Sequence, residues 1–322
     1  MNNLKIEKSK NENEWNDFLF NSINKNIYCH SDFINSLEGK FSKFLVKKNK
    51  EIVASFFLQE KEKNIKLSNE TIYTPFIFKN YKNRSTSSLN TEKFEITSFF
   101  KKFLIDNYIK IDYISDYHLN DLRPFYFHNF DKKEEVFSIK FVNYTTLLQI
   151  QDINKELDFQ NSKFYKNLSV NLRRQYNYSF TRKKYNLIEG YEKEIFKDLV
   201  KKTFARQNLK VDFDIDTRSI LFEKLNKSKN IKMYYALEDK IVKSFALFGL
   251  INDHAVYLHG GRSEEEKNDY SLTHTLIQSF VNLNKNGINS IDLEGINSPN
   301  RGFYKLGYGG TILPYYHVAK LK

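Results

Sequence analysis

Two carboxylates, a tyrosine and a lysine lie close together near the C-terminus, at Asp292, Glu294, Tyr304 and Lys305. Asp292 stands at the C-terminal end of a predicted strand, the edge of an α/β sheet where ligands usually bind. A carboxylate there can hold a cation or accept a proton, or it can cap the following loop by accepting backbone N–H groups. Lys305 precedes a group of glycines, and a fixed cation can stabilise negative charge that develops on a carbonyl oxygen. A surface lysine in a glycine-rich turn is the alternative interpretation.

The residue spacing gives little support for metal binding or covalent catalysis. The seven histidines are scattered and no His-x-x-x-His occurs. Cys29 is the only cysteine, so neither an intrachain disulfide nor a cysteine metal site can form. No Ser-His-Asp or Cys-His arrangement is recognisable, and His259 on its apolar strand is interpreted as a core residue. We therefore predict no metal and no tightly bound cofactor.

The N-terminal residues and the cysteine content bear on localisation. The opening MNNLKIEKSKNENEW lacks the apolar run of a signal peptide. No stretch approaches the roughly 18 apolar residues that suggest a membrane span. A single cysteine fits a reducing compartment. We therefore expect a cytoplasmic protein without a transmembrane segment that can work close to the membrane surface.

Positive charge is concentrated in residues 155–207. This segment holds 13 Lys or Arg and 6 Asp or Glu, so its net charge of +7 exceeds half of the chain's +12. Such a concentration favours phosphate as a partner. Tyr165, Tyr176 and Tyr178 lie among the basic residues and can stack on a base or a sugar. The alternative is a solvated helix face in a lysine-rich protein.

The chain also contains an internal repeat. Residues 50–58 read KEIVASFFL and residues 239–247 read DKIVKSFAL. Each follows a strand and a polar turn, which predicts a β-hairpin in each half. A third strand, a helix and a strand with Ile-Asp follow in both halves. Chance similarity between two amphipathic hairpins is the alternative, and the shared order of elements speaks against it.

The length of 322 residues predicts two domains with separate cores. We expect an α/β fold with a mixed sheet covered by helices in each half, divided into residues 1–150 and 151–322. The second half is predicted to contain helices and strands in the following places: helices at 161–180, 191–208, 214–226, 270–285 and 301–306; strands at 230–238, 240–250, 253–260, 289–293 and 311–319.

The block Asp292-Leu-Glu-Gly295, followed by Tyr304-Lys305-Leu-Gly307-Tyr-Gly309, resembles the closing signature of the FemAB-like branch of the GNAT acyltransferases. That signature is Asp, a hydrophobic residue, any residue, Gly, then Phe-Lys-x-Gly-Phe-Gly. Residues 167–174 and 204–207 are similar to the arginine-containing helices of the family. The resemblance covers nearly the whole chain, and it implies two tandem GNAT domains and an activity that forms amides.

The resemblance also implies roles for the site residues. Lys305 is expected to contact the donor carbonyl or its oxyanion, next to Tyr304, while Asp292 holds or deprotonates the attacking amine. Asp292 and Glu294 both stay open as the base or as a loop cap. Arg173 and Arg206 are expected to contact substrate phosphate or carboxylate, and Arg174, Glu294 and Arg301 are the other expected substrate-binding residues.

The acyl donor is expected to be aminoacyl-tRNA or acyl-CoA. A CoA-binding GNAT domain has a glycine-containing pyrophosphate loop between a strand and a helix. Here the corresponding residues 262–270 contain no glycine and three consecutive acids, which disfavours pyrophosphate. We therefore favour a large polyanionic donor over CoA.

Three functions remain open on the sequence. The first is transfer of an aminoacyl or acyl group to an amine of a cell-envelope or sugar precursor. The second is CoA-dependent N-acetylation of a nucleotide-linked or lipid-linked amino sugar. The third is RNA binding without catalysis on the same fold.

Overall fold

The computed structural model describes residues 3–68, 70–127, 137–154, 159–263 and 269–320. The chain forms two compact units, one of residues 1–144 with 313–322 and the other of residues 145–312. The predicted division placed the whole C-terminus in the second domain, whereas residues 313–322 belong to the first unit. No helix in the described ranges is long and apolar enough to cross a membrane.

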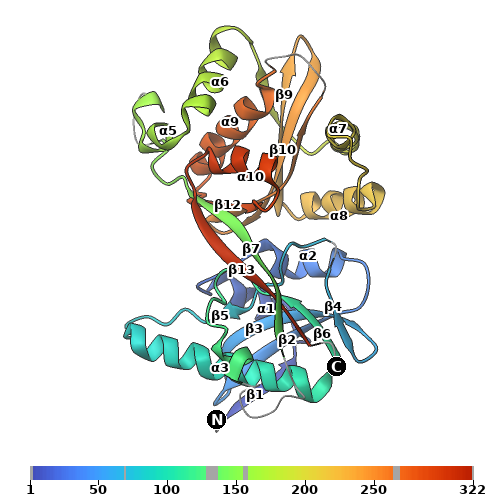
Figure 1. Ribbon diagram of the computed structural model, residues 1–322, viewed down its shortest axis with the longest axis vertical. Coiled ribbons are helices and arrows are strands. Elements are labelled where there is room, and N and C mark those ends of the chain that lie inside the picture. Colours follow the sequence, from blue (N-terminus) through green and yellow to red (C-terminus); the bar gives the residue numbers. More distant parts are fainter. Residues whose placement is uncertain (1–2, 69, 128–136, 155–158, 264–268, 321–322) are drawn as a thin grey trace. The chain divides into compact units, whose positions relative to one another are not determined.

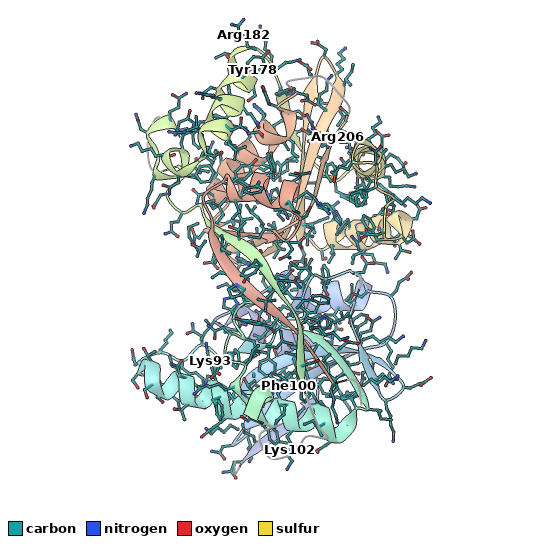
Figure 2. All side chains as sticks on the ribbon, in the orientation of Figure 1. Lys93, Phe100, Lys102, Tyr178, Arg182 and Arg206 are labelled. Atoms are coloured by element: carbon teal, nitrogen blue, oxygen red, sulfur yellow. The ribbon has the colours of Figure 1, made fainter. Side chains whose placement is uncertain are left out.

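The first unit is a sheet in the order β1-β2-β3-β4-β6-β13 with helices packed on it. Phe56, Phe76 and Phe100 stack at its centre, with ring centroids 4.5 to 5.5 Å apart. Phe100, labelled in Figure 2, belongs to the long helix α3, labelled in Figure 1. The elements are β1 Leu4–Lys8, α1 Glu12–Phe20, α2 Ser31–Ser36, β2 Phe41–Lys48, β3 Glu51–Lys61, β4 Asn64–Lys66, β5 Ile77–Phe78, α3 Thr86–Asn107, β6 Lys110–Ile114, α4 Arg123–Phe127 and β13 Thr311–Lys320.

The second unit is a sheet in the order β7-β12-β11-β10-β9-β8. Helices α6 and α9 cover one face and α7 and α8 the other (Figure 1). Alternation along β10 explains the two layers, because Phe245 contacts Phe196 of α7 while Phe248 contacts Phe280 of α9. The elements are β7 Ser138–Gln149, α5 Lys163–Asn167, α6 Val170–Thr181, β8 Asn186–Glu189, α7 Lys193–Arg206, α8 Ile215–Lys227, β9 Ile231–Glu238, β10 Ile241–Ile251, β11 His254–Arg262, α9 Ser271–Lys285, β12 Ser290–Gly295 and α10 Pro299–Leu306.

Most predicted elements of the second half are present within two or three residues. The predicted helix at 161–180 is two helices, because the chain leaves helical geometry at Leu168 and Ser169 caps α6 through the backbone N–H of Leu172. The prediction also missed β8, a strand of four residues without a strong apolar pattern.

The predicted hairpins are confirmed in both halves. β2 and β3 are joined by Asn49-Lys50, with φ of 51° and 74°, and β9 and β10 by Asp239-Lys240, with φ of 49° and 67°. Positive φ at both central residues defines the type I′ turn that suits a two-residue hairpin. The strand orders also correspond, since each sheet has one parallel pair, β4 with β6 and β11 with β12, at the same place in the order.

The last strand of each half completes the sheet of the other half. β7 follows the helices of the first unit, but its residues 145–149 pair with β12. β13 follows α10 of the second unit, but its residues 317–320 pair with β6. This exchange explains why residues 313–322 belong to the first unit.

The two hairpin turns give a matched stability test. We expect Lys50→Gly and Lys240→Gly each to stabilise the protein by about 1 kcal/mol, because left-handed backbone costs a non-glycine residue roughly 1–2 kcal/mol. The greater freedom of glycine in the unfolded chain offsets part of this gain. The measurement is urea unfolding, with Lys66→Gly in β4 as the control that should destabilise. A loss of stability in either turn variant would contradict the turn assignment.

Candidate functional site

Four of the predicted site residues, Asp292, Glu294, Tyr304 and Lys305, lie at and just after the point where two parallel strands of the second unit separate. β11 and β12 pair only at His254–Val256 with Ser290–Asp292, although β11 continues to Arg262. β12 ends at Gly295 and α10 follows it. The C-terminal ends of adjacent parallel strands are a common ligand site, because the chain leaves the sheet there and opens a crevice.

Asp292 holds the bend at the end of β12. Its side chain is fully buried, and Oδ1 accepts hydrogen bonds from the backbone N–H of Glu294 at 2.8 Å and from the hydroxyl of Thr145. Glu294 has a φ of 60°, and the register between β12 and β7 shifts between Asp292 and Gly295. Of the two predicted roles, the structure thus shows the loop-capping contact. Proton transfer by Asp292 stays a prediction.

Lys305 reaches back from α10 to the end of β12. Its Nζ donates to the carbonyl of Gly295 at 3.2 Å and lies 5.5 Å from the ring centre of Tyr257. Burial lowers the pKa of Lys305, and the carboxylates of Glu294 and Asp292 oppose that shift. The lysine therefore lies in a poorly solvated place where a positive charge acts strongly on a neighbouring carbonyl.

A chain of hydroxyl groups fixes the ring of Tyr304. The Tyr308 hydroxyl donates to the Tyr304 hydroxyl at 2.8 Å, and Thr273 lies 3.2 Å from the same oxygen. Thr273 donates its proton to the amide oxygen of Gln175 at 2.6 Å, so it accepts from Tyr304. Burial raises the pKa of Tyr304, which stays a hydroxyl donor at neutral pH. Sequence reasoning missed Thr273 and Gln175, since neither belongs to a motif.

His259 lies on the face of β11 that α7 and α8 cover, among the rings of Phe196, Phe213 and Phe222. Burial lowers its pKa far below the usual value, with a further contribution from the cation of Arg218. The imidazole is therefore neutral, and its Nε2 accepts from Arg218 Nη1 at 3.1 Å. This packing agrees with the interpretation of His259 as a core residue.

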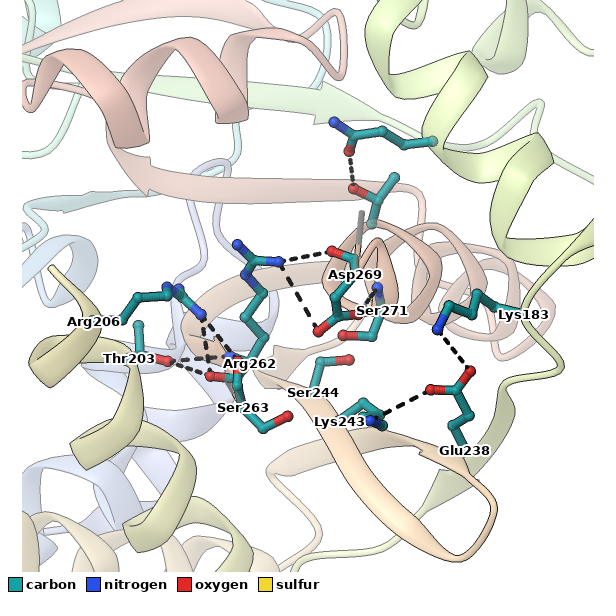
Figure 3. Close-up of polar contacts among 12 residues, drawn as sticks. Lys183, Thr203, Arg206, Glu238, Lys243, Ser244, Arg262, Ser263, Asp269 and Ser271 are labelled. Atoms are coloured by element: carbon teal, nitrogen blue, oxygen red, sulfur yellow. Dashed lines mark hydrogen bonds and ion pairs between the residues drawn. The ribbon is translucent and has the colours of Figure 1, made fainter. Parts of the chain in front are cut away.

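Arg206 lies at the C-terminal end of α7 (Figure 2). Its side chain binds backbone carbonyls at the end of β11. Its Nη1 donates to the carbonyls of Arg262 and Ser263, at 3.4 and 3.2 Å. Thr203 donates to the same Arg262 carbonyl, as Figure 3 shows. The side chain thus supports the strand end, and its contact with a substrate stays a prediction.

The remaining predicted arginines lie on the surface. Arg174 on α6 and Arg301 on α10 are exposed, and Arg173 is half-buried. Within the described part of the chain, none of the three side chains has a hydrogen bond or an ion pair. Arg301 is close enough to Lys305 to lower the pKa of the lysine further. The structure therefore brings Arg301 to Lys305 and leaves Arg173 and Arg174 on α6.

The predicted basic segment divides into two parts with different charge environments. Residues 163–184 contain seven Lys or Arg and no Asp or Glu, so they hold the whole excess of +7. Among the described residues only Lys183 of these seven forms an ion pair, with Glu238. By contrast, three lysines of α7 pair with carboxylates. Figure 2 labels Tyr178 in the last turns of α6 and Arg182 directly after that helix, both within residues 163–184.

The glycine motif connects this basic part to the site. The backbone N–H of Ser169, which begins α6, donates to the carbonyl of Gly307 at 2.8 Å. A Cβ on Gly309 would lie 2.8 Å from the carbonyl of Asn167, and Gly309 also has a φ of 80°. Both observations require glycine, because another side chain would push α5 and α6 away from the motif.

A cavity of about 290 Å³ lies beside the same motif, and Tyr308 and Gly309 line part of it. Its walls come from the end of β7, from α5 and from the start of β13. Polar residues, among them Gln149, Asp152, Lys163 and Asn167, line it together with apolar residues. The described His, Cys, Asp and Glu residues contain no group of three that could hold a metal ion.

The corresponding carboxylate of the first unit is already paired. Asp112 accepts from Lys140 at 2.8 Å and lies 2.9 Å from Nε2 of His317. These bonds lower its pKa against the effect of burial. Of the two Ile-Asp strands, the one in the second unit is accompanied by a half-buried lysine and tyrosine, Lys305 and Tyr304.

Comparison with known proteins places this geometry in a fold. No protein-family model matches the sequence, and no curated protein matches it. The structure is similar to that of FemX, with a TM-score of 0.66, 13% identity, and coverage of 97% of this chain and 96% of FemX.

Two further structures agree. The C-terminal domain of a putative lysylphosphatidylglycerol synthetase from Agrobacterium fabrum gives a TM-score of 0.57 at 10% identity, with 97% of this chain and 92% of that one covered. A tandem GNAT protein from the clavulanic acid biosynthesis pathway gives a TM-score of 0.50 at 8% identity, with 98% and 97% covered. The predicted fold is confirmed: the chain shares the fold of FemX and of the tandem GNAT protein.

Proposed function

We propose that this chain is an acyltransferase that moves an aminoacyl or acyl group to an amine of a cell-envelope or sugar precursor. The observation that carries the proposal is the poorly solvated Lys305, held against the carbonyl of Gly295 where β11 and β12 separate. The fold supports it, because the similar structures include FemX and a tandem GNAT protein.

In the proposed reaction an amine attacks the carbonyl carbon of an ester or thioester. The new C–N bond forms, the carbonyl oxygen becomes negative, and the ammonium of Lys305 stabilises that charge. The bond to the donor oxygen or sulfur then breaks. The proton lost by the amine passes to a base and finally to the leaving group.

Glu294 is the better candidate for this base. It is less buried than Asp292 and its charge acts on Lys305 directly. Asp292 already accepts two hydrogen bonds at Oδ1, so that oxygen is engaged in holding the bend at the end of β12. Tyr304 donates toward Thr273 and serves to orient the reacting groups beside Lys305.

The basic surface of α5 and α6 favours aminoacyl-tRNA as the donor. Arg174, Tyr178 and Arg182 are exposed at four-residue spacing along α6, which places them on one face of the helix. Unpaired cations attract a phosphate backbone, and an exposed tyrosine can stack on a base. CoA, with three phosphates, would use less of this surface. Binding of RNA without turnover is the competing outcome.

The first test concerns the charge of Lys305. We expect Lys305→Met to lower kcat by a factor on the order of a hundred to a thousand, the usual effect of losing one oxyanion donor. The measurement is transfer of a labelled aminoacyl or acyl group, with Lys285→Met as a control that keeps full activity. Unchanged transfer by a folded Lys305 variant would remove this lysine from the mechanism.

The same variant has an expected effect on stability. The folded-state pKa of Lys305 is lowered, so its charged form is less favourable in the folded protein than in the unfolded chain. The resulting loss of stability is present below the folded pKa and disappears as pH rises toward the unfolded value. At neutral pH, Lys305→Met should therefore raise the midpoint of urea unfolding while it abolishes transfer. A lower midpoint would contradict the shift.

The second test concerns the donor. We expect the double variant Arg174→Ala, Arg182→Ala to bind aminoacyl-tRNA more weakly and with less salt dependence. Each lost phosphate contact on a single strand reduces the slope of log affinity against log salt by about 0.7. The measurement is a titration at two salt concentrations, with the ion-paired Lys197→Ala and Lys202→Ala as controls. Tight and weakly salt-dependent acetyl-CoA binding, without tRNA affinity, would favour the acetyltransferase instead.

A further inference from the structure

The start of helix α9 has the features of an anion-binding position. α9 has 15 residues and follows the end of β11, and its N-cap residue Tyr270 makes no side-chain capping bond. The first turn of such a helix offers unpaired backbone N–H groups and the positive end of the helix dipole. Proteins commonly use this arrangement to bind a phosphate.

Three hydrogen-bond donors converge at the start of α9, and all three donate to Asp269. Oδ1 of Asp269 accepts from the backbone N–H of Ser271 at 2.8 Å and from the hydroxyl of Tyr185 at 3.0 Å. Nη1 of Arg262 donates to the backbone carbonyl of Asp269 at 2.7 Å and lies 4.0 Å from Oδ2. Figure 3 shows the arginine turned toward Asp269.

The position is buried and retains unused polar atoms. Asp269 is 6% exposed and Ser271 is fully buried. Among the described residues, Oδ2 of Asp269 and the hydroxyl of Ser271 have no hydrogen-bond partner. An anion with more oxygen atoms in place of this carboxylate could also accept from the Ser271 hydroxyl.

We propose that Asp269 determines donor specificity by filling this anion position with its own carboxylate. A phosphate placed there would meet a second negative charge in a buried site, which is strongly unfavourable. The inference rests on the proposed acyl transfer, since it states which donors the enzyme excludes. The phosphates of an accepted donor must then bind to another surface, and a CoA-type pyrophosphate is excluded from the start of α9.

The test is to remove the carboxylate and measure anion binding directly. Calorimetric titration with inorganic pyrophosphate and with CoA, at fixed ionic strength, is carried out on the full chain. We expect Asp269→Ala to bind both at least tenfold more tightly than the unchanged protein, because Tyr185 and the backbone N–H of Ser271 then lack their acceptor and Arg262 lacks the carboxylate 4.0 Å away. Asp269→Asn keeps the bond to Ser271 and should gain less.

Two controls separate this site from general charge effects. Asp198→Ala removes an exposed carboxylate of α7 and should gain nothing. Adding Arg262→Ala to Asp269→Ala should abolish the gain. The proposal is wrong if Asp269→Ala, or Asp269→Asn where the alanine variant does not fold, binds pyrophosphate no better than Asp198→Ala. It is equally wrong if the gain survives without Arg262.

The titration does not depend on catalysis. A protein that gains pyrophosphate binding in the Asp269 variant but transfers no acyl group would support the anion position and refute the proposed function. A protein that transfers acyl groups but gains no binding would support the function and refute the role of Asp269.

Discussion

The candidate site depends on the hydrogen bond between the buried carboxylate of Asp292 and the backbone N–H of Glu294. This bond holds Glu294 in a left-handed conformation, which a non-glycine residue adopts only at a cost. The bend ends β12 and presents the carbonyl of Gly295 to Lys305. Without this hydrogen bond β12 would lose the bend that ends it, and Lys305 of α10 would lose its carbonyl acceptor. The same carboxylate therefore shapes the loop and supports the charge of Lys305.

The electrostatics of the second unit follow from partial burial. Lys305 has too little solvent to keep its usual pKa, and two nearby carboxylates restore part of what burial removes. Such a compromise is typical of functional sites, because a fully paired lysine would not act on a substrate and an unpaired one would not stay charged. In the first unit the corresponding Asp112 is paired with Lys140.

Anion recognition in this unit is distributed over two places with opposite properties. At the start of α9 the carboxylate of Asp269 accepts from a tyrosine and from a helix N-terminus and lies 4.0 Å from an arginine, which donates to the backbone carbonyl of the same residue. On α5 and α6 the cations have no internal partner apart from Lys183 among the described residues. A charge that is satisfied inside the protein contributes to stability and specificity, whereas an unsatisfied one is available to a ligand. This contrast is the physical basis for preferring a polyanion bound on α6.

The sequence by itself determined the local features. Turn chemistry predicted both hairpins, apolar periodicity predicted most elements of the second half, and the Asp292 to Gly309 block indicated the tandem GNAT fold. These features depend on residues close in sequence. Tertiary structure alone decided which sheet β13 joins, which lysines of 155–207 are paired, and that Asp269 meets Arg262 and Tyr185. Strand partners, burial and charge pairing depend on residues far apart in the chain, and hydrophobic period carries no information about them.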